Sequence, residues 1–229
     1  MIFTSTILAG ASGSINGLTF SRNRGGQYIR TRAVPTNPNT AQQAALRTIF
    51  GNLASAWQTL TATQREDWTT YAINVPVTNK LGNPLTLTGQ QMYVRCNTPR
   101  LQAGFSRVDD GPKTFALDSL QTVSAAAVAA TGKIGVVFDD TDEWLDEDDA
   151  GLLVYASRLV GPAINFFKGP YRLAGKIDGD SVTPPTSPDL SLDSPFALTA
   201  GLFQFYRFLS VRADGRISAD QFHGPVIVS

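Results

Sequence analysis

The spacing of apolar residues changes type along this chain, and that change constrains the fold more than any other feature. In the first half, apolar side chains recur at steps of three and four, the period of one helix face; they are Leu46, Ile49, Phe50, Leu53, Trp57 and Leu60. From about Lys113 onward, short β-type runs bounded by turn-forming residues replace this pattern. The sequence therefore predicts an α+β chain of several domains, in which a helical region precedes a β region.

We expect about three helices in the first half of the chain. An asparagine–threonine pair that ends at Thr40 can cap the first helix. Capping-box patterns at Thr61–Gln64 and Thr88–Gln91 begin the second and third helices. The third helix is expected to end near Asn97, because Pro99 disfavours helical backbone in the residue before it.

The second half is expected to form an antiparallel β-sandwich of the fibronectin type III or immunoglobulin-like kind. Six β-type runs are spaced as the strands of such a sandwich would be, at residues 122–129, 134–138, 152–157, 171–177, 203–211 and 226–228. The single cysteine, Cys96, excludes an intramolecular disulfide, which favours the fibronectin-like variant. The run Phe203–Phe208 is apolar on both strand faces, so we expect a central strand covered by the sandwich on one side and by a partner on the other.

The first 38 residues show no helical period and are expected to form an extended arm or hairpin. Asn23–Gly26 suits a hairpin turn, since consecutive glycines supply the positive φ angles that such turns require. Pro35 and Pro38 mark the end of the arm. The predicted organisation is an arm over residues 1–38, a helical anchoring domain over 39–110 and a β-sandwich over 111–229.

Charge is distributed unevenly, although the net charge of the chain is zero. Residues 1–110 carry ten basic and four acidic side chains, whereas residues 111–229 carry nine basic and fifteen acidic ones. No acidic residue occurs before Glu66. A uniformly cationic segment favours an anionic partner surface, either nucleic acid or the acidic half of a neighbouring copy.

Five residues of the arm are the candidate partner-binding residues: Arg22, Arg24, Tyr28, Arg30 and Arg32. Arginines that alternate with polar residues beside an aromatic are typical of nucleic-acid contacts. However, a dedicated phosphate-binding surface has a higher density of positive charge than these four arginines provide. We therefore favour an edge strand that is protected by its charges and pairs with a neighbouring protein, with direct DNA contact as the alternative.

The sequence contains no recognisable catalytic, cofactor-binding or metal-binding pattern. The acidic segment Asp139–Asp149 lacks the glycine and glutamate spacing of an EF-hand, so we expect a solvated loop away from buried structure. A nucleophilic triad would need Cys96 or His223, and both fit structural roles better. The first ten residues do not have the pattern of a signal peptide or a membrane span. We expect a protein that is not an enzyme and is made in the cytoplasm.

Several segments resemble a family of uncharacterised phage and prophage proteins, and together they extend over nearly the whole chain. They are Ser21–Arg32, Pro35–Thr40 with Gln43, Trp57–Trp68, Thr88–Gly89, Tyr93–Arg95 and Ala213–Arg216. The resemblance implies a virion or prophage setting. It implies no role for any individual residue.

These features predict a non-enzymatic virion structural protein, either a capsid-associated decoration protein or a minor capsid protein, anchored to its neighbours by the arm. The expected partners are major capsid, portal, neck or tail subunits and further copies of the chain, with no membrane contact. One alternative is a neck or tail structural protein. Another is a receptor- or carbohydrate-binding module of the virion, for which exposed aromatic residues at Trp144 or in the turn Asn165–Phe167 are the candidates.

Overall fold

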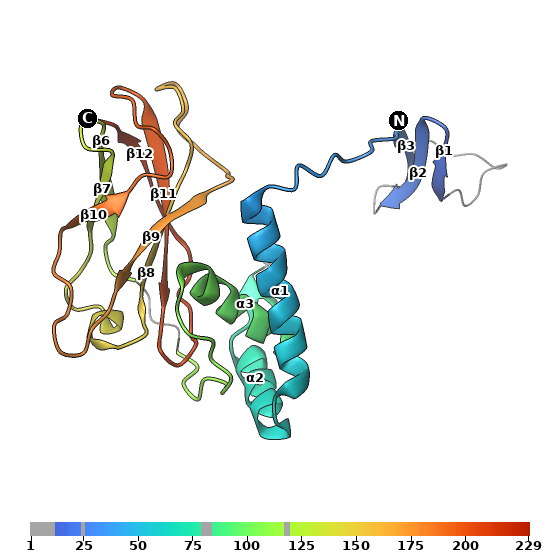
Figure 1. The fold of residues 1–229 in the computed structure, drawn as a ribbon. Coiled ribbons are helices and arrows are strands. Elements are labelled where there is room, and N and C mark those ends of the chain that lie inside the picture. Colours follow the sequence, from blue (N-terminus) through green and yellow to red (C-terminus); the bar gives the residue numbers. More distant parts are fainter. Residues whose placement is uncertain (1–11, 24–25, 79–83, 117–119) are drawn as a thin grey trace. The chain divides into compact units, whose positions relative to one another are not determined.

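The computed structural model describes residues 12–23, 26–78, 84–116 and 120–229 (Figure 1). By their contacts, residues 1–43 and residues 44–229 form two compact units, which are described separately. The chain has the mixed α+β composition that the sequence predicts, with three α-helices and several antiparallel sheets in its described part.

The first unit contains a three-stranded antiparallel sheet, here called the N-terminal sheet. Its strands are β1 (Gly13–Ile15), β2 (Leu18–Asn23) and β3 (Gly26–Thr31), in the order β1-β2-β3. The pairing of β2 with β3 extends from Leu18↔Thr31 to Asn23↔Gly26, which confirms the predicted hairpin. Residues 24 and 25, on which the predicted turn falls, lie outside the described residues. Residues 32–40 follow without regular secondary structure, and all of them are exposed.

The helices begin where the capping patterns predict. They are α1 (Ala41–Thr59), α2 (Ala62–Asn74) and α3 (Gly89–Ala103), with a short hairpin of β4 (Val77–Thr78) and β5 (Pro84–Leu85) before α3. The Thr40 hydroxyl accepts a hydrogen bond from the Gln43 N–H at 3.3 Å, as a capping residue does. Both predicted capping boxes, starting at Thr61 and Thr88, make their two reciprocal hydrogen bonds.

The predicted end of the third helix is wrong, because α3 continues past Asn97 and includes Pro99. A proline inside a helix costs about 3 kcal/mol through its missing N–H and its steric clash with the preceding turn. Tertiary contacts on both sides of Pro99 offset this cost. The Asn97 side chain donates to the Val108 carbonyl at 3.0 Å and accepts from the Val108 N–H at 2.8 Å, and Arg100 is fully buried among acceptors.

Seven described strands follow the helices and form two antiparallel sheets. They are β6 (Ser124–Val128), β7 (Lys133–Val137), β8 (Gly151–Ala156), β9 (Arg172–Asp178), β10 (Asp189–Asp193), β11 (Phe203–Val211) and β12 (Gln221–Ile227). The first sheet has the order β10-β7-β6, and the second has the order β12-β11-β8-β9. Strand β10 is absent from the sequence prediction, because its sequence is polar and only Leu192 of its five residues is buried.

The two sheets share one hydrophobic core, here called the first core. Strands β6, β7 and β10 contribute small and branched side chains such as Ala127, Ile134 and Leu192. The second sheet contributes Tyr206 and Phe208 from β11 and alternate residues of β8. This core therefore contains the inner faces of both sheets.

A second core joins the helices to the outer face of the four-stranded sheet. Leu53, Trp68 and Tyr93 of the helices pack in one cluster with Leu209 and Val211 of β11. Because side chains alternate along a strand, β11 places one set of side chains in each core. The sequence predicted that a partner would cover the second face of this strand. At Leu209 and Val211, the chain's own helices cover this second face of β11.

The acidic segment is only in part the solvated loop that the sequence predicts, because most of its carboxylates are exposed but its centre is buried. It contains a 3-10 helix, η1 (Glu143–Asp146), whose Trp144 and Leu145 are each only 2% exposed. The carboxylate of Asp142 accepts hydrogen bonds from the Gln121 N–H at 3.1 Å and the Trp144 indole at 3.3 Å. Burial raises the pKa of Asp142, and these hydrogen bonds oppose that effect. The aromatic centre of the segment belongs to the first core.

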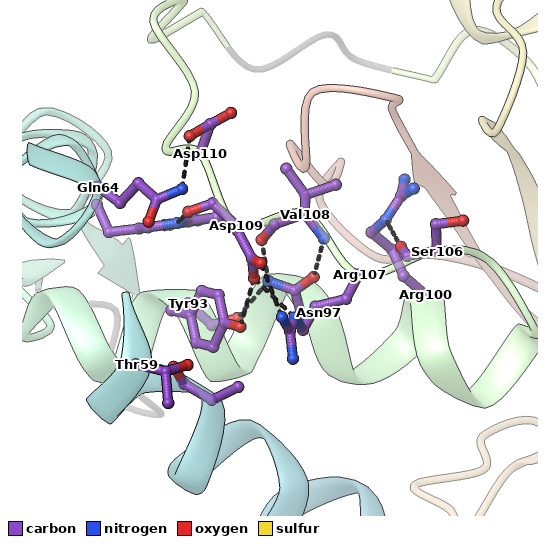
Figure 2. A network of polar contacts seen from close by, with 12 residues as sticks. Thr59, Gln64, Tyr93, Asn97, Arg100, Ser106, Arg107, Val108, Asp109 and Asp110 are labelled. Atoms are coloured by element: carbon purple, nitrogen blue, oxygen red, sulfur yellow. Dashed lines mark hydrogen bonds and ion pairs between the residues drawn. The ribbon is translucent and has the colours of Figure 1, made fainter. Parts of the chain in front are cut away.

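A strap of residues 105–111 crosses the helices and is held by polar contacts (Figure 2). The carboxylate of Asp109 accepts hydrogen bonds from the Tyr93 hydroxyl at 3.0 Å and from the Arg107 guanidinium at 2.6 and 2.7 Å. The indole of Trp68 donates to the Asp109 carbonyl at 2.9 Å. At the end of the strap, a Cβ on Gly111 would lie 2.6 Å from the Trp68 nitrogen, so the close approach of the two backbones requires glycine.

Arg100 connects α3 with the strands and with the acidic segment. Its guanidinium donates to the Arg212 carbonyl at 2.6 Å, to the Asp149 carboxylate at 2.6 Å and to the Ser106 carbonyl at 3.0 Å. Its side chain is fully buried. Burial lowers the pKa of Arg100, and the charge of Asp149 opposes that shift.

We expect Arg100→Met to lower the free energy of unfolding by about 3 kcal/mol, because it leaves buried acceptors without donors. Urea denaturation followed by circular dichroism measures the change. Arg95→Met, on the same helix but exposed, is the matched control and should change stability by less than about 0.5 kcal/mol. Equal effects of the two substitutions would contradict a structural role for the buried guanidinium.

Candidate docking surface

The N-terminal sheet has no core of its own. Among residues 12–43, none of those with a described exposure is buried. Both hydrophobic cores begin further along the chain, the earliest member being Leu53. A small sheet needs a hydrophobic face packed against another element to be stable by itself. The sheet therefore gains little stability from its own contacts.

One face of the N-terminal sheet is apolar. Paired residues of an antiparallel sheet lie on the same face, and the pairs Ile15↔Leu18 and Phe20↔Ile29 share one. Ile15 is 69% exposed and Leu18 is 46% exposed, while Phe20 and Ile29 are partly exposed. A contiguous apolar face of this kind on a small sheet is typical of a surface that packs against another protein.

The opposite face of the sheet is polar. The pairs Thr19↔Arg30 and Ser21↔Tyr28 lie on it, and the hydroxyls of Ser14 and Thr19 are 2.9 Å apart. Arg30 is exposed. The sheet thus presents an apolar face and a face of hydroxyls with one guanidinium.

The structure divides the predicted partner-binding residues between the two faces. Tyr28 and Arg30 share the polar face, whereas Arg22 pairs with Gln27 at one end of the apolar face. Arg32 lies one residue beyond β3, and its backbone N–H donates to the Gly17 carbonyl at 2.8 Å. Arg24 lies outside the described residues. The predicted set is therefore not a single cationic surface.

The sequence prediction did not include the apolar residues of the sheet. Their signal was present, because Leu18 and Phe20 alternate with polar residues along β2, and Ile29 lies between polar residues on β3. The glycines around these short runs favoured the interpretation as an extended arm or hairpin, whose contacts were expected from its charged residues and Tyr28. If Asn23 pairs with Gly26 as the predicted turn requires, each earlier residue of β2 pairs with the corresponding later residue of β3, and this pairing puts Phe20 opposite Ile29.

The two outer strands of the N-terminal sheet provide a second kind of contact. In the described sheet, β1 and β3 are the edge strands and pair only with β2. An edge strand leaves one row of backbone N–H and C=O groups available for pairing with another chain. Addition of a strand is a common way for one protein to hold another.

Charge separates the two units. Residues 1–43 contain four arginines and no acidic residue, a net charge of +4. Since the whole chain has 19 basic and 19 acidic residues, residues 44–229 have 15 basic against 19 acidic, a net charge of −4. The first unit is therefore attracted to acidic surfaces.

The other candidates from the sequence occupy structural positions. Cys96 is fully buried in the second core, and burial raises its pKa to about 12. His223 lies on β12 opposite Tyr206 and is partly exposed. Within the described ranges, no group of three or more His, Cys, Asp or Glu side chains is arranged to hold a metal ion. No described helix is both long and apolar enough to cross a membrane.

No family model, curated protein or solved structure matches this chain. Among the described surfaces, the N-terminal sheet combines an apolar face, edge strands and an excess of positive charge without a core.

We expect Cys96 of the folded chain not to react with a thiol reagent such as 5,5′-dithiobis(2-nitrobenzoate). At about pH 8 the thiolate fraction of a group with this pKa is on the order of one in ten thousand, and the side chain is inaccessible. In concentrated urea, one thiol per chain should react. Stoichiometric reaction of the folded chain would show that the thiol is accessible and reactive after all.

We expect removal of residues 1–38 to leave the thermal midpoint within about 2 °C of the intact chain, because neither core contains any of the described residues of this segment. Differential scanning calorimetry of the two proteins measures the difference. A fall of more than about 5 °C would mean that the segment stabilises the remainder of its own chain.

Proposed function

We propose that this chain is a non-enzymatic structural protein of a tailed-phage or prophage virion, anchored to neighbouring proteins through its N-terminal sheet. One observation carries the proposal: the N-terminal sheet has an apolar face and positive charge but no buried residue of described exposure, whereas residues 44–229 contain two cores. A unit that has its own cores does not need such a sheet for stability. The sheet is suited to building the chain into an assembly.

Three properties of the sheet make it a suitable anchor. Its apolar face, centred on Phe20 and Ile29, supplies area for hydrophobic burial against a neighbour. Its edge strands supply backbone groups that fix the register of a contact. Its arginines favour acidic protein surfaces and increase the rate of encounter with them.

The virion setting is supported by the resemblance to phage and prophage proteins described above. Within a particle, we propose a capsid-associated position, as a decoration or minor capsid protein. Its partners are then the major capsid protein and further copies of this chain. A neck or tail position is the alternative, with the same anchoring principle.

For the second unit we propose a β-sandwich of the fibronectin type III kind. Among the seven strands β6 to β12 of this unit, the fourth is β9, and it pairs with β8 and not with β10. In a constant-type immunoglobulin domain, the fourth strand joins the sheet of the first, second and fifth strands, so the observed pairing favours the fibronectin-like arrangement. Such sandwiches serve many functions, so this fold is compatible with the structural role and does not by itself imply it.

A role without catalysis is supported by the use of the charged side chains inside the second unit. Arg212 binds the carboxylates of Glu143 and Glu147 at 2.9 and 2.6 Å. Asp149 is engaged by Arg100 and by the Ser106 N–H. These ion pairs and hydrogen bonds join separate elements of the chain, which is a structural use of the charged groups.

The proposal predicts that the chain sediments with purified virus particles and that its arm is protected there. Trypsin should cleave the free protein after Arg22, Arg30 and Arg32, which are exposed. In particles, cleavage at these sites should be slower by at least about tenfold, because the sheet is covered. Mass spectrometry of timed digests measures both rates. Absence of the chain from particles, or equal cleavage rates, would contradict the proposal.

Paired substitutions separate the apolar anchor from the remainder of the sheet. Phe20→Ser with Ile29→Ser makes the centre of the apolar face polar and should abolish incorporation into particles. Ser21→Ala lies on the opposite face and should leave incorporation unchanged. The number of copies of each variant per purified particle, measured relative to the major capsid protein, tests both expectations.

A further inference from the structure

The outer face of the four-stranded sheet contains an aromatic cluster beyond the residues that the helices cover. Leu209 and Val211, near the end of β11, belong to the second core. Phe205, near the start of the same strand, lies outside that cluster. Phe167 stacks on Phe205, with ring centroids 6.0 Å apart. Tyr171 is 5.3 Å from Phe167 and 5.9 Å from Phe222. Four rings from three separate parts of the chain thus form one connected group.

These rings line a hollow of about 300 Å³ that is open to solvent. Phe222 forms part of its wall and is 65% exposed, and the adjoining Phe166 is 76% exposed. Asn165 and Lys168 also line it, and neither side chain hydrogen-bonds to another described residue. No carboxylate is among the lining residues. His223 of β12 is a further lining residue. The hollow therefore combines aromatic walls with the amide of Asn165 and the ammonium group of Lys168, which are available to a ligand.

The wall is held in place before any ligand binds. The Tyr171 hydroxyl donates a hydrogen bond to the Phe167 carbonyl at 3.0 Å, which fixes the loop before β9. The edge-on contact between the Phe167 and Tyr171 rings fixes their orientation as well. A binding surface that is ordered in advance loses less entropy when a ligand enters.

We propose that this hollow binds a saccharide unit, a function that goes beyond the structural role and does not depend on it. A pyranose ring has one face of C–H groups, which packs on an aromatic ring, and an edge of hydroxyls, which needs hydrogen-bonding groups. The exposed ring of Phe222 and the side chains of Asn165 and Lys168 match these two requirements. The volume lies at the lower end of ligand pockets and suits one or two sugar rings.

The composition of the hollow also defines the class of sugar and the outcome of binding. Lys168 brings a positive charge without a neighbouring carboxylate, so sugars with a carboxylate are favoured over neutral ones. Glycoside hydrolysis needs a pair of carboxyl groups across the bond, which the lining does not supply. The hollow therefore binds saccharides and leaves them intact.

A protein partner on the same surface is the rival occupant, and the hollow fits it less well. A stable protein contact buries roughly 800 Å² on each side, usually over a flat area. Here the exposed rings surround a concavity, and the uncompensated polar groups lie at its wall. Sedimentation of the intact chain distinguishes the two occupants, because a self-contact through these rings makes the mass concentration-dependent.

The test uses the full-length chain and three defined probes: trigalacturonate, cellotriose and chitotriose. Binding is followed by ¹H–¹⁵N correlation spectroscopy and by calorimetry. We expect trigalacturonate to bind most tightly. Phe222→Ala should weaken binding of every bound probe by about tenfold, and Lys168→Gln should weaken only trigalacturonate. Phe50→Ala removes another exposed phenylalanine, from α1, and should have no effect.

Three results would overturn the inference. The first is that a folded chain, verified by its thermal midpoint, binds none of the three probes at millimolar concentration. The second is that Phe222→Ala binds the probes as the unchanged chain does. The third is a concentration-dependent mass that Phe222→Ala abolishes, which assigns the rings to a contact between copies. The arm variant Phe20→Ser with Ile29→Ser should bind sugars normally, so failure of the anchor and failure of the hollow are separate results.

Discussion

Strand β8, in the middle of the four-stranded sheet, is apolar on both faces, and the second unit depends on covering them. All six residues of β8 are buried. Leu152, Val154 and Ala156 pack in the first core, while Leu153 and Tyr155 pack in the second. Burial of apolar area contributes about 25 cal/mol per Å², so a sheet of this composition is stable only between two layers. The sheet of β10, β7 and β6 forms one of these layers, and the helices form the other.

Polar contacts determine how the helical layer lies on the sheet. Arg100 of α3 reaches the Arg212 carbonyl at the end of β11, and the Arg212 guanidinium binds Glu147 in turn. Hydrogen bonds in a buried setting strengthen one another, and each mispaired group is costly there. Apolar packing alone would permit several arrangements of helices on a sheet. The buried guanidinium favours a single one.

Signals within a few residues of one another predicted local structure well. The capping boxes at Thr61 and Thr88 and the hairpin turn between Asn23 and Gly26 each involve four residues, and the structure has the helix starts and the strand pairing that they imply. The continuation of α3 through Pro99 was not predictable in this way. It depends on Val108 and Arg212, which come after the helix and are brought to it only by folding.

In the candidate docking surface too, local features were predictable from the sequence and contacts between separate segments were not. Tyr28 and Arg30 share a face because they are two residues apart on the same strand, β3. The position of Arg22 on the opposite face depends on the pairing between two strands. The burial of Trp144 was likewise hidden, because its neighbours Asp142 and Glu143 suggested a solvated segment, and only folding provides the first core around the indole.

The exposed stretch between β3 and α1 limits the distance between the end of the N-terminal sheet and the start of the first helix. Residues 32–40 form no regular secondary structure and include two prolines, which keep such a linker extended. Nine residues span at most about 30 Å. If the N-terminal sheet is docked, the start of α1 lies within about that distance of the end of β3, and any weak second contact that the remainder of the chain can then reach becomes intramolecular. Its effective concentration is then in the millimolar range, so even a contact of modest affinity would be occupied most of the time.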